Sequence, residues 1–135
     1  MNIILLYLIS ALHLFYILFL IGVPILATSN CLLLLHAIII PFMLAHWYTN
    51  QNMCVLTTIE KEMRRRVYGQ EDSDILDDCF TCRLIEPVYD FHKDMGRFTE
   101  FIYIFVICLW LCTLYKLYLN YHNGKITSFK DLFIC

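Results

Sequence analysis

Long uncharged stretches dominate the chain of 135 residues. Residues 3–27, 31–48 and 101–115 contain no Asp, Glu, Lys or Arg. A bilayer core about 30 Å thick is crossed by about 20 helical residues. The first stretch exceeds that length, the second lies near the lower limit, and the third reaches it when extended to 97–118. The pattern therefore predicts three transmembrane helices over about 3–27, 31–48 and 97–118.

A short polar helix is expected between the second and third of these spans. The stretch Thr57-Thr58-Ile59-Glu60 fits a capping box, in which the Thr57 hydroxyl binds the amide of residue 60 and the Glu60 carboxylate binds the amide of residue 57. We predict a helix over about 58–68 that begins at this box. Cys54 is expected to pack in the same turn, and residues 69–96 are expected to form a polar loop.

The arrangement of side chains along 58–68 is typical of a helix that lies on a membrane surface. Its apolar residues form one narrow stripe at a spacing of four: Ile59, Met63 and Val67. Two pairs of opposite charge are spaced to interact along the helix: Glu60–Arg64 and Glu62–Arg66. Trp47 and Tyr48 indicate a membrane interface just before it, which favours this interpretation over a solvated surface helix. The fold class is thus all-α: a single membrane domain, 1–135.

The distribution of charge predicts an orientation. Only 16% of the residues are charged, and residues 49–97 contain seven of the ten Lys and Arg and ten of the twelve acids. Basic residues near a span are retained in the cytoplasm, so the amino terminus and the central segment are expected inside and the carboxyl tail outside. The ten acidic residues of this segment would cancel the positive electrostatic field that binding to a nucleic acid requires. We expect the lipid bilayer as partner, with other membrane proteins or a second copy of the chain, and no nucleic acid.

His13 and His36 are ionisable residues within apolar stretches, and such residues are candidates for function. Counted from the turn at residues 28–30, their depths differ by roughly 13 Å, which is too far for one metal or haem unless Pro24 ends the first helix early. We interpret both as packing histidines, His13 bonded to Ser10 or to a neighbouring helix, and keep ligation as the alternative.

Seven cysteines raise the question of thiol or metal chemistry. Cys79 and Cys82 form a CxxC pair, to which Cys54 and His92 could add two zinc ligands. The spacing from Cys54 to Cys79 fits no standard zinc pattern. An odd number of cysteines scattered over apolar runs and a cytoplasmic loop also argues against a secreted disulfide framework. We expect most of them to be small apolar residues or reduced thiols.

Four sequence motifs resemble those of a known family. They are "ALHLFYILFL", "LLHAIIIPF", "CVLTTIEKEMRRR" and "IEPVYDFHKDMGRFTEF". Together they resemble an uncharacterised family of small multi-pass membrane proteins, best represented in bacteria, whose main motif is Cys-Pro-Leu-Thr-x-x-Glu. Similar versions occur among hypothetical membrane proteins of large DNA viruses. Val55 and Thr58 replace two prolines of the family pattern that would preset the helix start. The resemblance implies an integral membrane protein, in a viral or host membrane, and no particular reaction.

No phosphate loop, HExxH motif or nucleophile elbow is present in the sequence. The function we expect is therefore that of a non-enzymatic structural or interaction component of a membrane, without a cofactor. The alternative is a membrane thiol-redox or metal-binding protein that uses Cys54, Cys79 and Cys82.

Overall fold

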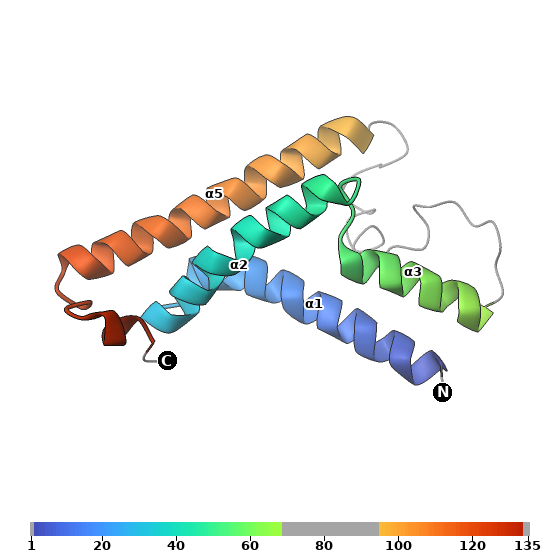
Figure 1. Ribbon diagram of the computed structural model, residues 1–135, viewed down its shortest axis with the longest axis horizontal. Helices are drawn as coiled ribbons and strands as arrows, with labels where there is room; N and C mark the ends of the chain where they lie inside the picture. The colour runs from blue at the N-terminus through green and yellow to red at the C-terminus, as the bar shows by residue number, and fades with distance from the viewer. Residues whose placement is uncertain (1, 69–94, 134–135) are drawn as a thin grey trace. The chain divides into compact units, whose positions relative to one another are not determined.

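The computed structural model describes residues 2–68 and 95–133, and every regular element in them is helical. The α-helices are α1 (Asn2–Leu26), α2 (Asn30–Thr49), α3 (Val55–Tyr68) and α5 (Met95–His122), and a short 3-10 helix, η1, covers Phe129–Leu132 (Figure 1). Within these described ranges no strand occurs, so the predicted all-α fold is confirmed.

Three of the helices are long and apolar enough to cross a membrane: Ile3–Leu26, Asn30–Thr49 and Thr99–His122. The prediction of three helices that could span a membrane is therefore confirmed, and the helix ends differ slightly from the predicted ones. The last span begins after Arg97 and continues to His122. Pro24 does not end α1 early, because the helix continues to Leu26. A turn then leads into α2, where the amide of Leu33 donates to the carbonyl of Ser29 at 3.2 Å.

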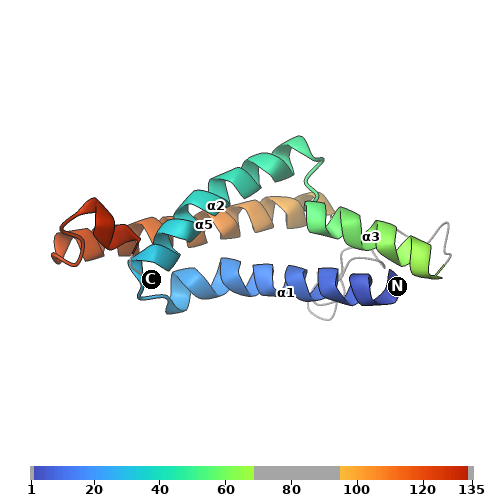
Figure 2. The same ribbon diagram turned by 60° about the horizontal axis from the view of Figure 1, so that its bottom comes forward.

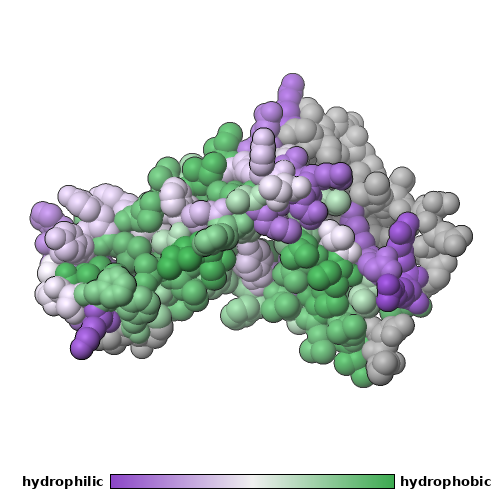
Figure 3. Space-filling model, in the orientation of Figure 1, coloured by the Kyte–Doolittle hydropathy of each residue, from purple (hydrophilic) through white to green (hydrophobic). Residues whose placement is uncertain are grey.

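The chain divides into two compact units. Unit 1 is Met1–Phe15 with Trp47–Glu100, and unit 2 is Tyr16–His46 with Phe101–Cys135. In unit 2 the second half of α1 packs with α2 and α5. Its buried apolar side chains come from all three helices: Leu20, Val23, Leu33, Ile40, Met43, Val106 and Leu109. Apolar side chains also cover much of the molecular surface in Figure 3, and among those exposed in unit 2 are Leu18, Ile38, Phe42 and Leu111.

In unit 1, α3 runs alongside the first half of α1 (Figure 2). A sharp turn leads into it from α2. Gln51 and Asn52 have positive φ angles of 53° and 62°, and the amide of Asn52 donates to the carbonyl of Trp47 at 2.8 Å. Asn tolerates this left-handed conformation better than most residues do. The turn reverses the chain within a few residues and sets α3 against α1.

The start of α3 corrects the predicted capping box. The helix begins at Val55 rather than near 58, and both the amide and the hydroxyl of Thr58 donate to the carbonyl of Cys54, at 3.1 and 3.3 Å. Thr57 consequently lies inside the first turn of the helix, and the amide of the next residue, Thr58, makes the first helical bond. The Glu60 carboxylate binds side chains instead of the Thr57 amide. The predicted box is therefore wrong, because tertiary partners compete for Glu60.

The buried face of α3 also differs from the predicted apolar stripe. Ile59 is 39% exposed, and Met63 and Val67 are half-buried, whereas Glu60 is fully buried. The two predicted ion pairs are confirmed, with Glu60–Arg64 at 2.9 Å and Glu62–Arg66 at 2.8 Å. The carboxylate of Glu60 thus decides which side of α3 faces α1.

Candidate functional site: buried polar contacts between helices

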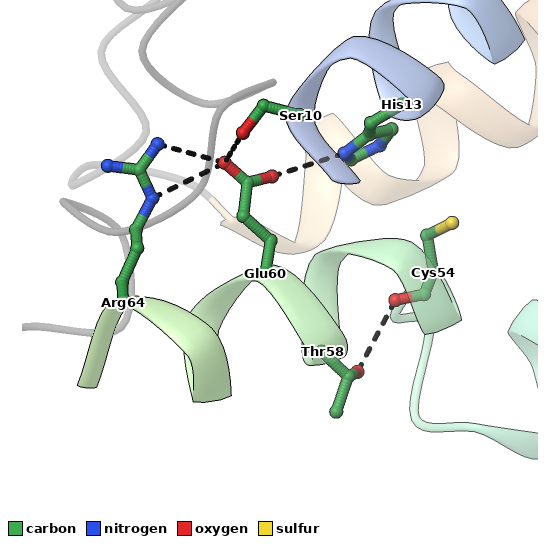
Figure 4. Close-up of polar contacts among 6 residues, drawn as sticks. All are labelled: Ser10, His13, Cys54, Thr58, Glu60 and Arg64. Atoms are coloured by element: carbon green, nitrogen blue, oxygen red, sulfur yellow. Dashed lines mark hydrogen bonds and ion pairs between the residues drawn. The ribbon is translucent and has the colours of Figure 1, made fainter. Parts of the chain in front are cut away.

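The Glu60 carboxylate is the centre of a buried polar cluster in unit 1, and none of its side chain is exposed. One oxygen, Oε1, accepts from the Ser10 hydroxyl at 3.1 Å and from Arg64 Nη2 and Nε at 2.9 and 3.3 Å. The other oxygen, Oε2, lies 3.4 Å from His13 Nδ1 (Figure 4). We call Ser10, His13, Glu60 and Arg64 the Glu60 cluster. It joins α1 to α3.

The spacing of the residues explains how one carboxylate reaches three partners. Ser10 and His13 are three residues apart on α1, so they lie on the same face of that helix. Arg64 follows Glu60 by one helical turn on α3 and folds back over it. The carboxylate therefore lies between the Arg64 guanidinium and the Ser10 hydroxyl, which share Oε1, and the His13 imidazole, which faces Oε2, as Figure 4 shows.

The environment of Glu60 keeps its carboxyl group ionised. Burial by itself would raise the pKa of this carboxyl, but the hydrogen bonds from His13, Arg64 and Ser10, together with the charge of Arg64, lower the pKa below its usual value. An ionised carboxylate only accepts hydrogen bonds, so the facing Nδ1 of His13 is the nitrogen that carries a proton. Glu60 and Arg64 then form a buried ion pair that His13 and Ser10 complete.

A second polar contact, in unit 2, joins three helices at His36. The His36 side chain is fully buried, and its Nε2 lies 3.0 Å from the carbonyl oxygen of Leu20 in α1. Its Nδ1 lies 3.0 Å from the hydroxyl of Thr113 in α5. A carbonyl oxygen can only accept, so Nε2 donates. In the neutral ring Nδ1 then accepts from Thr113. The Phe19 ring lies 5.6 Å from the imidazole.

Further polar side chains of α5 bind main-chain groups in unit 2. Trp110 Nε1 donates to the carbonyl of Ala37 at 2.9 Å. The ammonium of Lys116 donates to the carbonyls of Ile25 and Ala27, at 2.8 and 3.4 Å. These carbonyls lie in the last turn of α1 and just after its end, where the helix dipole is negative and a cation is favoured. Trp110 and Lys116 of α5 thus bind main-chain groups of α2 and of the end of α1.

The two histidines of the apolar helices have different hydrogen-bond partners. His13 belongs to unit 1 and His36 to unit 2, and each makes its own contacts. His13 was expected to bind Ser10 or another helix; it approaches Glu60 of α3, and Ser10 binds the same carboxylate. Among residues 2–68 and 95–133, no group of three or more His, Cys, Asp and Glu is arranged to hold a metal ion.

The cysteine predictions have mixed outcomes. Cys54 is a half-buried free thiol, and Cys108 and Cys112 are exposed free thiols on α5. Cys31, at the start of α2, is disulfide-bonded, so it is an exception to the expectation that most of the cysteines are small apolar residues or reduced thiols. Cys79, Cys82 and His92 lie outside the described residues, so a thiol or metal site that includes them stays a prediction.

Sequence reasoning missed how the two polar contacts are completed from other helices. Glu60 was not expected to bind Ser10 and His13, and Thr113, the partner of His36, was not singled out. One signal was available: a Ser and a His three residues apart in an apolar helix require a polar partner from elsewhere. No family model, curated protein or solved structure matches the chain, so the family resemblance of its motifs stays a prediction.

Proposed function

We propose that this chain is a small multi-pass integral membrane protein with a non-enzymatic, structural or interaction-mediating role. One observation carries the proposal: the three apolar helices expose many large apolar side chains, whereas several of their polar side chains, His13, His36 and Thr113, are buried. In the most apolar stretch of 18 residues of each span, only 17%, 22% and 17% of the residues are buried within the chain. The remaining, mostly apolar surface is suited to lipid or to other membrane helices.

The polar clusters support a structural role. The Glu60 carboxylate is used by Ser10, His13 and Arg64, and both nitrogens of His36 have partners within the chain. Polar side chains whose hydrogen bonds are made within the chain stabilise the packing of helices where water is scarce. A catalytic group, in contrast, has to reach a substrate.

Membrane integration is tested by extraction. The protein should remain in the membrane fraction after washing at alkaline pH and high salt, and detergent should release it. Release by alkaline washing alone would contradict the proposal.

Metal analysis of the detergent-purified protein tests the non-enzymatic role: we expect no stoichiometric metal or haem. Bound zinc would favour the alternative site at Cys54, Cys79 and Cys82.

We propose that the amino terminus and the segment 49–97 lie in the cytoplasm and the carboxyl tail on the opposite side. Seven of the ten Lys and Arg lie in that segment, whereas the turn Thr28–Asn30 has none. The disulfide at Cys31 supports the same orientation, because disulfides persist in oxidising compartments. In sealed microsomes, protease should remove an amino-terminal epitope tag and spare a carboxyl-terminal one. The reverse pattern would overturn the orientation.

On the cytoplasmic side, α3 is proposed to lie at the membrane surface. Arg65 and Arg66 are on its exposed side, away from the buried Glu60, and are suited to anionic headgroups. Trp47 and Tyr48, at the end of α2, support an interface at this level. The resemblance of the sequence motifs is the basis for proposing a virion or host-cell membrane.

A further inference from the structure

The carboxyl tail folds back onto unit 2 after α5. Its first turn contains Gly124, whose φ is +72°, and the amide of Lys125 donates to the carbonyl of Asn120 at 2.9 Å. The Asn120 side chain donates to the side chain of Asn30 at 2.7 Å, and Asn30 Nδ2 lies 3.5 Å from the carbonyl of Lys125. Because Asn30 is the first residue of α2, the tail is held at the same level as the turn between α1 and α2.

The 3-10 helix η1 in this tail is fixed by one carboxylate. Asp131 Oδ2 accepts from the amide and hydroxyl of Thr127, at 2.8 and 2.9 Å, and from the amide of Ser128 at 2.8 Å. The amide of Asp131 in turn donates to the carbonyl of Ser128 at 3.1 Å. These donors lower the pKa of the Asp131 carboxyl, which therefore stays charged and keeps the turn closed.

The closed turn presents two aromatic rings on its surface. Phe129 is 75% exposed and Phe133 is 59% exposed, and their ring centroids lie 5.1 Å apart in an edge-to-face arrangement. Two exposed tyrosines, Tyr118 and Tyr121, lie on the last turns of α5, just before this tail. A rigid turn that holds two phenylalanines together outside the core needs an apolar environment for them.

The position of the rings indicates what covers them. The candidate span ends at His122, and η1 begins seven residues later. Aromatic side chains collect at the boundary between headgroups and acyl chains. Lys125 and Lys130, in the same tail as the rings, are exposed, and their ammonium groups complement lipid phosphates. Exposed apolar rings and cations in one short tail after a candidate span are complementary to a phospholipid surface.

We propose that Phe129 and Phe133 form an interfacial anchor, inserted into the bilayer leaflet on the side of the α1–α2 turn. The inference rests on the proposed membrane integration and does not depend on which side of the membrane this leaflet faces. The tail then adds a fixed contact with lipid at the end where Lys116 and Asn120 tie the helices together.

The test is photocrosslinking of the full chain reconstituted in phosphatidylcholine–phosphatidylglycerol vesicles. Benzoylphenylalanine is incorporated at position 129 in one protein and at position 111 in another. Leu111 is 53% exposed in the middle of α5, so it reports membrane integration itself. Both substituted side chains are exposed, so the fold should persist, and the elution profile in detergent checks this.

We expect lipid adducts, identified by mass spectrometry, at both positions. In the protein with the probe at 129, the additional substitution Asp131→Ala should reduce the lipid adduct by opening the turn, whereas Lys130→Ala should leave most of it. A lipid adduct at 111 with none at 129 would overturn the anchor and leave membrane integration intact. Adducts of position 129 to a second copy or another protein would also overturn it. Absence of lipid adducts at both positions would overturn the proposed function as well.

Discussion

Removing the charge of Glu60 is the most informative perturbation of this chain. The side chain is completely buried, and its partners His13 and Arg64 have only 4% and 16% of their side chains exposed. Breaking a buried ion pair by removing one partner costs about 3–5 kcal/mol. A glutamine oxygen can still accept one hydrogen bond, and Arg64 reaches some water. We therefore expect Glu60→Gln to lower the free energy of unfolding by about 3 kcal/mol, the lower end of that range.

The chain contains a matched control in the same helix. Glu62 forms the same kind of pair with Arg66, one turn later, but their side chains are 47% and 61% exposed. Exposed pairs of this spacing contribute about 0.3–0.5 kcal/mol. Glu62→Gln should thus be nearly neutral, although it removes the same charge from the same element. Comparing the two variants separates the effect of burial on stability from the effects of the lost charge and of helix propensity.

Thermal unfolding in mild detergent, followed by circular dichroism and by retention of a monodisperse elution peak, measures both variants. With about 2–4 °C per kcal/mol, Glu60→Gln should lower Tm by roughly 6–12 °C and Glu62→Gln by only about 1–2 °C. Equal shifts for the two variants would refute the reasoning, because the cluster would then contribute no more than a surface pair.

Other predictions concern pH, the unit 2 contacts and the start of α3. The folded-state pKa of Glu60 is lowered, so its contribution is complete above the ordinary value of 4.5 and is lost as the pH falls through the folded value. The Tm difference between wild type and Glu60→Gln should accordingly be constant above pH 5.5 or so and narrow below about pH 4. Thr113→Val leaves His36 Nδ1 without its donor and should cost about 1–2 kcal/mol, whereas Thr113→Ser should restore most of the stability in the same melting assay. Thr57→Ala should be mild, in contrast to the loss that a capping box would predict, and a Tm fall as large as that of Glu60→Gln would contradict the described helix start.

The three spans could be predicted because length and the absence of charge suffice to recognise them. The salt bridges within α3 could be predicted for a similar reason: a spacing of four residues on a helix fixes both partners. Both features depend only on residues close together in the sequence.

The role of Glu60 could not be predicted in that way. A Thr with a Glu three residues later fits a local cap, and the sequence does not show that α1 supplies a hydroxyl and an imidazole fifty residues away. The chain reverses its direction at Gln51 and Asn52, ahead of the predicted cap, and this reversal brings α3 against α1. The Thr-Asn-Gln-Asn stretch at residues 49–52 was the available turn signal, because Asn favours such turns.

The hydroxyl of Thr113 has one hydrogen and two neighbouring acceptors. It lies 3.0 Å from His36 Nδ1 and 3.2 Å from the carbonyl of Leu109. If His36 takes up a second proton, Nδ1 becomes a donor, and the hydroxyl can turn its hydrogen to Leu109 and accept from the ring instead. The same pairs of heavy atoms are hydrogen-bonded in both arrangements. The junction of α1, α2 and α5 can therefore hold either protonation state of His36 without losing a contact between the helices.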